Sequence, residues 1–222
     1  MGVDLETPDH TTLSRRSQRL EVSCSRISAH GSIDLVVDST GLAIVGEGEW
    51  AAAKHGQRGW KKLHLGVDQS GAIIAHALTE STVDDATTGI GLIAAVDDDI
   101  ARVTADAAYD TIAFYNAAVT RGATVVVPPD KTARVSRRRP RSRARDRTVT
   151  AVKAIGRRRW KKASGYHRQA RVENAIFRHK SIIGDRLRAR HLKAQKTESV
   201  TACNILNRTT ELGRPASFAI GS

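Results

Sequence analysis

Hydrophobic and polar residues alternate along the first part of this chain in a pattern that predicts three strands. Residues 61–68 (KKLHLGVD) place apolar side chains at every second position, which is the period of a half-buried strand. An apolar run at 33–38 predicts a strand before it, and residues 72–79 predict a strand after it. Residues 69–71 (QSG) are typical of a hairpin turn, so the second and third strands are expected to pair antiparallel.

The pattern then changes to alternating helices and strands. Residues 84–95 carry apolar side chains at helical spacing, with acidic residues in what would be the first turn, and predict a helix. A strand at 100–106, a helix at 110–119 and a strand at 124–127 follow. The order β, β, β, α, β, α, β describes a ribonuclease-H-like α/β fold, in which a mixed sheet has helices on its faces.

The N-terminal residues differ from this domain in pattern. Residues 1–30 are polar and irregular, and TLSRRSQRL within them resembles a short amphipathic helix capped by Thr12 or Ser14. We interpret residues 1–30 as the remnant of an N-terminal region. Residues 31–222 are expected to form one ribonuclease-H-like domain, because 222 residues suffice for one full α/β domain with a core.

Charge is distributed unevenly along the chain. Residues 1–130 hold 10 Lys and Arg against 18 Asp and Glu, whereas residues 131–222 hold 26 against 5, and the net charge is +13. Residues 131–162 alone hold 15 Lys and Arg with few large apolar side chains. Such a segment cannot bury enough surface to fold compactly unaided, so we interpret residues 131–164 as a basic insertion that is loosely ordered without nucleic acid.

Three acidic residues occur where a shared metal site could form. Asp38 ends the first apolar run, Asp106 ends the strand at 100–106, and Glu173 lies in a predicted helix at 165–183. Open α/β sheets place ligands at the carboxyl ends of strands. A single such residue is more often a cap, a turn residue or an exposed helix glutamate. Only the three together, combined with the basic second part, favour a metal-dependent enzyme that acts on nucleic acid.

The chain carries no recognisable membrane or export signal. It has no apolar run of about 18 residues, which a membrane-spanning helix would need, and no basic-then-apolar signal peptide. We therefore expect a cytoplasmic protein. A last predicted helix, at 193–212, has an apolar side and completes the domain.

Four segments in order resemble the DDE transposases of bacterial insertion sequences. They are VVDSTGLAIVGEGEW, KHGQRGWKKLHLGVD, VTADAAYD and GYHRQARVENAIFRHKSIIGDRLRAR. The last is similar to the Tyr-x2-Arg-x3-Glu-x6-Lys signature of that family, with Tyr166, Glu173 and Lys180 at the required spacings. Gln169 stands at the arginine position and Ala107 at the usual glycine after the second aspartate. The family also has a longer N-terminal helical region, so the resemblance implies an N-terminally shortened member.

The resemblance implies both a reaction and a set of site residues. Asp38 would bridge two Mg²⁺ ions, with Mn²⁺ as the alternative ion, while Asp106 binds one ion and Glu173 the other. Divalent ions about 3.5–4 Å apart would then support cleavage and strand transfer at phosphorus. The residues of or beside the signature that would contact DNA are Tyr166, Arg168, Arg171 and Lys180. The basic run itself adds Arg137, Arg138, Arg139 and Trp160 as candidate DNA contacts.

The implied partners are the transposon ends and the target DNA, bound by a homodimer or multimer associated with the nucleoid. Two hypotheses remain open at this point. The chain is a transposase that cleaves and joins DNA at insertion-sequence ends, or it is a catalytically inactive, truncated transposase that binds DNA and inhibits transposition. Trp160 has two interpretations as well, because it could stack on an unpaired base or serve as a packing anchor.

Overall fold

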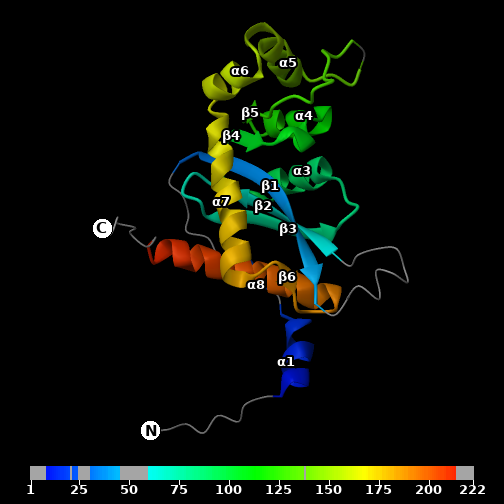
Figure 1. Cartoon of the computed structure of the whole chain (residues 1–222), viewed down its shortest axis with the longest axis vertical. Coiled ribbons are helices and arrows are strands. Elements are labelled where there is room, and N and C mark those ends of the chain that lie inside the picture. Colours follow the sequence, from blue (N-terminus) through cyan, green and yellow to red (C-terminus); the bar gives the residue numbers. More distant parts are fainter. Residues whose placement is uncertain (1–8, 21, 25–30, 46–59, 138, 214–222) are drawn as a thin grey trace, which may run out of the picture.

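A computed structural model describes residues 9–20, 22–24, 31–45, 60–137 and 139–213 of the chain. The strands are β1 (Ile33–Ile44), β2 (Trp60–Val67), β3 (Ile73–Glu80), β4 (Ile100–Ala105), β5 (Thr124–Val126) and β6 (Arg186–Leu187). The helices are α1 (His10–Ser17), α3 (Asp85–Ala95), α4 (Ile112–Thr120), α5 (Arg143–Ile155), α6 (Arg157–Ser164), α7 (Ala170–Arg178) and α8 (Leu192–Glu211) (Figure 1).

The strands form one mixed sheet in the order β3-β2-β1-β4-β5, and β6 pairs with the far end of β1. β1, β2 and β3 are antiparallel neighbours, whereas β4 runs parallel to both β1 and β5. The predicted α/β class, a ribonuclease-H-like mixed sheet flanked by helices, is confirmed. None of the described helices is both long and apolar enough to cross a lipid bilayer.

Helices cover both faces of the sheet. Along β1, Ile33, Leu35 and Val37 pack with α3 and α4, whereas Val36 and Leu42 pack with α7 and α8. Figure 1 shows α7 crossing one face of the sheet, with α3 on the other. A strand buried on both faces reads as a continuous apolar run, which is why the sequence at 33–38 does not alternate.

The ends of several elements differ from the sequence prediction. β1 continues to Ile44, six residues beyond the predicted strand, because β2 keeps pairing with it through Ala43 opposite Trp60. Helix α1 begins after Asp9, whose carboxylate accepts the Thr12 N–H at 2.7 Å, so Asp9 is the cap rather than Thr12 or Ser14. The two-residue strand β6 was not predicted.

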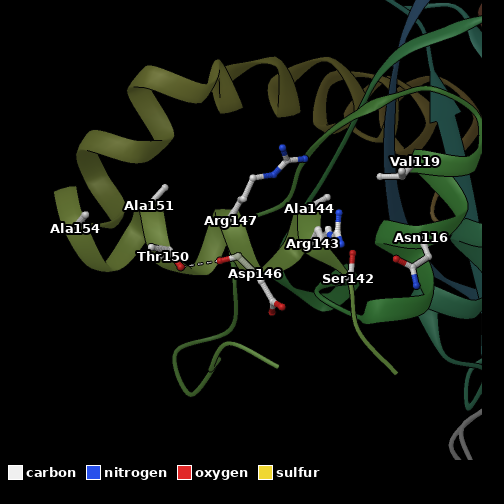
Figure 2. Close-up of a pocket in the computed structure, with 10 residues that line it drawn as sticks. All are labelled: Asn116, Val119, Ser142, Arg143, Ala144, Asp146, Arg147, Thr150, Ala151 and Ala154. Atoms are coloured by element: carbon white, nitrogen blue, oxygen red, sulfur yellow. Dashed lines mark hydrogen bonds between the residues drawn. The ribbon is translucent and has the colours of Figure 1, made fainter. Parts of the chain in front are cut away.

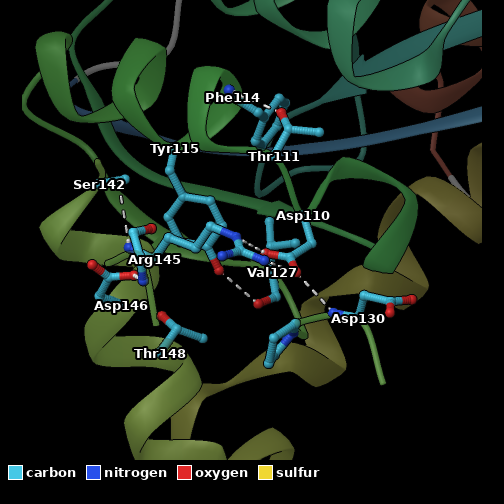
Figure 3. Close-up of polar contacts among 12 residues, drawn as sticks. Asp110, Thr111, Phe114, Tyr115, Val127, Asp130, Ser142, Arg145, Asp146 and Thr148 are labelled. Carbon is cyan, nitrogen blue, oxygen red and sulfur yellow. Dashed lines mark hydrogen bonds and ion pairs between the residues drawn. The ribbon is translucent and has the colours of Figure 1, made fainter. Parts of the chain in front are cut away.

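The basic insertion is folded, so the expectation of a loosely ordered segment is wrong for residues 143–164. Helix α5 is capped by Ser142 and buries Val149, and α6 buries Trp160. Arg145 of α5 donates two hydrogen bonds to Asp110, Nε to Oδ1 at 2.8 Å and Nη2 to Oδ2 at 2.9 Å (Figure 3). Tertiary contacts with the sheet domain therefore order a segment that is too polar to form its own core.

A groove of about 850 Å³ lies between α4 and α5. Val119 of α4 and the small residues Ala151 and Ala154 of α5 line it, together with Arg143 and Arg147 (Figure 2). Both arginines are exposed, and so are Arg137 and Arg139 before the helix. The insertion thus packs through a few residues and leaves most of its positive charge in solvent.

Candidate active site

Two of the three acidic residues are brought together by strand register. β1 and β4 pair in parallel, and the last paired residues are Val37 and Ala105. Asp38 and Asp106 come next on the two strands, and neighbouring strands lie about 4.8 Å apart. Asp106 follows the end of β4 as predicted, but Asp38 lies in the middle of β1 rather than at a strand end. Asp38 is nevertheless the first residue of β1 beyond its parallel pairing with β4.

Asp38 is held by groups on both sides of its carboxylate. The backbone N–H of Ser39 donates to Oδ1 at 2.8 Å, and Gln169 Nε2 lies 3.4 Å from both Oδ2 and the Val37 carbonyl oxygen. Gln169 is buried, with 2% of its surface exposed, and its Oε1 has no hydrogen-bond partner among the described residues. The residue at the signature's arginine position therefore faces inward, toward Asp38.

Asp106 also serves a local structural purpose. Its Oδ1 accepts the Ala108 N–H at 2.8 Å and caps the 3₁₀ turn Ala107–Tyr109. The ordinary interpretation of Asp106 as a turn residue is thus correct, yet this bond occupies only one oxygen. A carboxylate fixed in this way is oriented beside Asp38 and remains able to bind a ligand.

Glu173 lies on a helix rather than on a strand. It is exposed in the first turn of α7. The predicted single helix at 165–183 is in fact three segments: a 3₁₀ turn Tyr166–Gln169, the α-helix α7, and a π-helical turn His179–Ile183. Tyr166, Glu173 and Lys180, which are spaced by seven residues, therefore do not lie along one regular α-helix. π-helical turns inside helices occur frequently at functional sites.

The charges of all three carboxylates interact. Burial, together with the nearby charges of Asp106 and Glu173, raises the pKa of Asp38 to about 6, against hydrogen bonds from Ser39 and Gln169 that lower it. Like charges raise a carboxyl pKa when they lie close to it. Asp38 therefore lies near enough to Asp106 and Glu173 for their charges to interact, and we refer to the three residues as the acidic cluster.

A fourth carboxylate, that of Asp85, lies near this cluster. Burial raises the pKa of Asp106, the charge of Asp85 raises it further, and the charge of Lys161 lowers it. Asp85 accepts a hydrogen bond from Ser39 Oγ at 3.1 Å and pairs with Lys62 at 3.2 Å. The sequence indicated only a first-turn helix residue at this position, because nothing local reveals that α3 begins beside β1.

Tyr166 lies against the acidic cluster. Burial, together with the charges of Asp106, Glu173 and Asp38, raises the pKa of its phenol to about 12. Lys161 Nζ is 4.4 Å from the centroid of the Tyr166 ring, which is a cation–π distance. The 3₁₀ turn before α7 and the end of α6 therefore both contribute side chains to the site.

The other predicted DNA-contacting residues are placed unequally. Arg168 pairs with Asp34 at 3.3 Å and Arg171 is half-buried, whereas Lys180 is exposed in the π-helical turn. Trp160 is only 7% exposed, so the structure supports the packing anchor over the base-stacking interpretation. Some predicted features lie outside the described residues. They are the DNA contact Arg138, parts of the first and second family-like segments, and residues 1–8 and 25–30.

The donor atoms in the cluster are carboxylate oxygens, which hard divalent cations such as Mg²⁺ prefer. Within the described part of the chain, no group of three or more His, Cys, Asp or Glu side chains is arranged to hold one metal ion. The carboxylate oxygens are of the chemical kind that such an ion binds.

The mixed sheet and its acidic cluster define the ribonuclease-H-like class of protein. A family model described as a transposase DDE domain matches residues 29–208, and a second model with that description matches residues 1–47. The first match covers most of the chain, so this protein belongs to the DDE transposase family. No solved structure matches the chain.

The burial of Asp38, together with the nearby carboxylates, predicts that Asp38→Asn stabilises the metal-free protein. Because the folded-state pKa of Asp38, about 6, is above the unfolded value of 3.8, its ionised form opposes folding above pH 6 and this cost disappears as the pH falls toward 3.8. We expect thermal unfolding in EDTA at pH 8 to show a gain on the order of 1–3 kcal/mol, and a smaller gain at pH 5.

Asp34→Asn is the matched control for this stability measurement. Asp34 lies on the same strand but pairs with Arg168 at 3.3 Å and with Arg102 at 3.8 Å, so losing its charge should not stabilise the protein. A loss of stability for Asp38→Asn at pH 8 would show that the carboxylates do not repel one another.

Proposed function

We propose that this protein catalyses metal-dependent DNA cleavage and strand transfer at the ends of an insertion sequence. The observation that carries the proposal is the acidic cluster, in which the charge of Asp38 interacts with those of Asp106 and Glu173. Membership of the DDE transposase family supplies the class of reaction. DNA is then the substrate, both as transposon ends and as target.

The proposed roles of the carboxylates follow from their positions. Asp38 would be shared between two Mg²⁺ ions, or Mn²⁺ ions, with Asp106 holding one and Glu173 the other. When bound, these ions would stabilise the attacking and leaving oxygens of an in-line displacement at phosphorus. Ser39 and Gln169 orient the Asp38 carboxylate, and Ala108 orients that of Asp106.

The remaining roles concern the DNA backbone. Tyr166, Arg171 and Lys180 would contact phosphates around the cleaved bond. The exposed arginines of the insertion, among them Arg137 and Arg139, would bind phosphates without reading sequence. We also propose that two or more copies assemble on DNA, because cutting and joining two ends requires two active sites.

One observation keeps a second candidate function in view. Gln169 replaces the signature arginine and is turned inward, so a positive charge present in the family pattern is absent at that position. A chain that binds transposon ends but does not cut them would act as an inhibitor of transposition. The two candidates share DNA binding and differ in cleavage.

Nicking of a supercoiled plasmid that carries the element's own ends tests the proposal. We expect nicked and linear products in Mg²⁺ or Mn²⁺ and none in EDTA, because the carboxylates act only through bound ions. Asp106→Asn should remove the products while the band shift of the same plasmid persists. Binding without any nicking by the unaltered chain in either ion would favour the inhibitor instead.

A further inference from the structure

The position at which the family signature has arginine carries no charge in this chain, because Gln169 stands there. A phosphate that enters among Asp38, Asp106 and Glu173 needs positive charge around it beyond any bound metal ions. Gln169 is neutral, 2% exposed and directed at Asp38 and the Val37 carbonyl, so it cannot supply this charge. Arg171 and Lys180 are proposed above to contact phosphates from α7 and from the π-helical turn after it, so a further cation would come from another element.

The neighbouring arginine is already engaged. Arg168 Nε lies 3.3 Å from Asp34 Oδ2, and Arg102 Nη1 lies 3.8 Å from the same oxygen. Asp34 is four residues before Asp38 on β1, so Arg168 is tied to the strand outside the acidic cluster. Moving it to a phosphate would leave the half-buried Asp34 with a weaker partner.

Lys161, from the insertion, is a cation held against the turn that contacts Asp38. Its Nζ lies 4.4 Å from the Tyr166 ring centroid, and Tyr166 begins the 3₁₀ turn that ends at Gln169, whose Nε2 lies 3.4 Å from Asp38 Oδ2. The residue before Lys161, Trp160, is buried and fixes this part of α6. No ion pair of Lys161 occurs among the described residues, although it lies near the acidic cluster.

The contact with Tyr166 also leaves the ammonium group available. A cation–π interaction uses the face of the ring and does not need any particular N–H group of the lysine. A lysine ammonium has three N–H donors and binds phosphate as a compact point charge. Lys161 is thus held at the edge of the cluster with donors that phosphate oxygens can accept from.

We propose that Lys161 binds the phosphate at which DNA is cleaved, and so supplies from α6 the positive charge that the family signature places at position 169. The proposal rests on the proposed function, because it assumes that DNA enters this cluster. It gives the basic insertion a part in the active site itself, beyond general attraction to the DNA backbone.

Duplex oligonucleotides spanning the end of the element test this contact. Each duplex carries one uncharged methylphosphonate, moved one position at a time across the junction, and affinity is measured in Ca²⁺, which takes the same carboxylate oxygens. For the unaltered chain we expect neutralisation at one position near the junction to weaken binding about 10-fold or more, as the loss of a charged hydrogen bond would.

Lys161→Met should weaken binding to unmodified DNA by a similar factor. Its affinity should not fall further when the phosphate at that position of the duplex is neutralised. Met keeps the aliphatic stem that packs on Tyr166, and thermal unfolding checks that the variant is folded. Lys162→Met is the matched control, since Lys162 is exposed and adjacent. It should reduce general affinity while leaving the profile of positions unchanged. A Lys161→Met profile with the full loss at the junction would overturn the proposal.

A rescue experiment tests whether positions 161 and 169 serve the same phosphate. Adding Gln169→Arg to Lys161→Met should restore the loss of affinity that neutralising the phosphate at the junction causes in the unaltered chain. A folded double variant with the profile of Lys161→Met would overturn that equivalence. These profiles are read from binding alone, so an unaltered chain that shows them without nicking plasmid DNA would refute the proposed cleavage and leave the Lys161 contact standing.

Discussion

Glu173→Gln is expected to lower metal-dependent strand cleavage by about 10³-fold or more, a loss of roughly 4 kcal/mol in transition-state stabilisation. The amide keeps the shape of the side chain but loses the negative charge that would hold a divalent ion. DNA affinity should change by only about twofold, because it depends mainly on the exposed arginines and lysines of the insertion. A plasmid-nicking time course in Mg²⁺ measures the first quantity, and band shifts of the same plasmid measure the second.

Glu211→Gln is a matched control for this substitution. Glu211 lies at the exposed end of α8, where it pairs with Arg208 at 2.9 Å, so the same chemical change is made away from the acidic cluster. Cleavage by Glu211→Gln should equal that of the unaltered chain. Unchanged cleavage by Glu173→Gln would mean that Glu173 is an ordinary exposed residue of α7.

Much of the sheet could be predicted because its signals are local. The alternation along β2 and the turn before β3 are contained in a few consecutive residues, and both elements lie where the pattern indicates. The end of β1 was missed because residues 39–41 are polar or lack a side chain. Pairing with β2 through residues far along the chain extends the strand there, so propensity alone does not set its length.

The residues of the site also fall into those that the sequence indicated and those that it did not. Asp38, Asp106 and Glu173 were selected by a joint pattern of positions, and the charge of Asp38 interacts with those of the other two. Lys161 and Asp85 were not selected, because each is near the cluster only through the packing of a helix against the sheet. No spacing within the sequence reports such a contact.

The insertion shows where a compositional argument fails. Its low content of large apolar residues indicates that it has no core of its own, and that inference is sound. It does not exclude docking onto a neighbouring domain through a few residues. Arg145 and Trp160 provide that docking, and composition cannot distinguish them from the other arginines or from an exposed tryptophan.

The Arg145–Asp110 contact predicts a large effect on stability. The Asp110 side chain is 1% exposed, accepts both hydrogen bonds from Arg145, and also accepts the Asp130 N–H at 2.8 Å (Figure 3). Removing one partner of a buried pair leaves an uncompensated charge, which costs about 3–5 kcal/mol. We therefore expect urea unfolding of Arg145→Met to show a loss of that size.

A double variant distinguishes this cause from simple loss of packing. Asp110→Asn combined with Arg145→Met removes the stranded charge while keeping an oxygen for the Asp130 N–H, so it should recover most of the lost stability. Arg143→Met, at an exposed position of the same helix, should change stability by less than about 0.5 kcal/mol. If Arg145→Met were as stable as Arg143→Met, the insertion would be held by contacts other than this pair. Asp110 lies four residues after Asp106. The Arg145–Asp110 contact therefore joins α5, which precedes the helix that carries Lys161, to the segment that carries the proposed metal ligand Asp106.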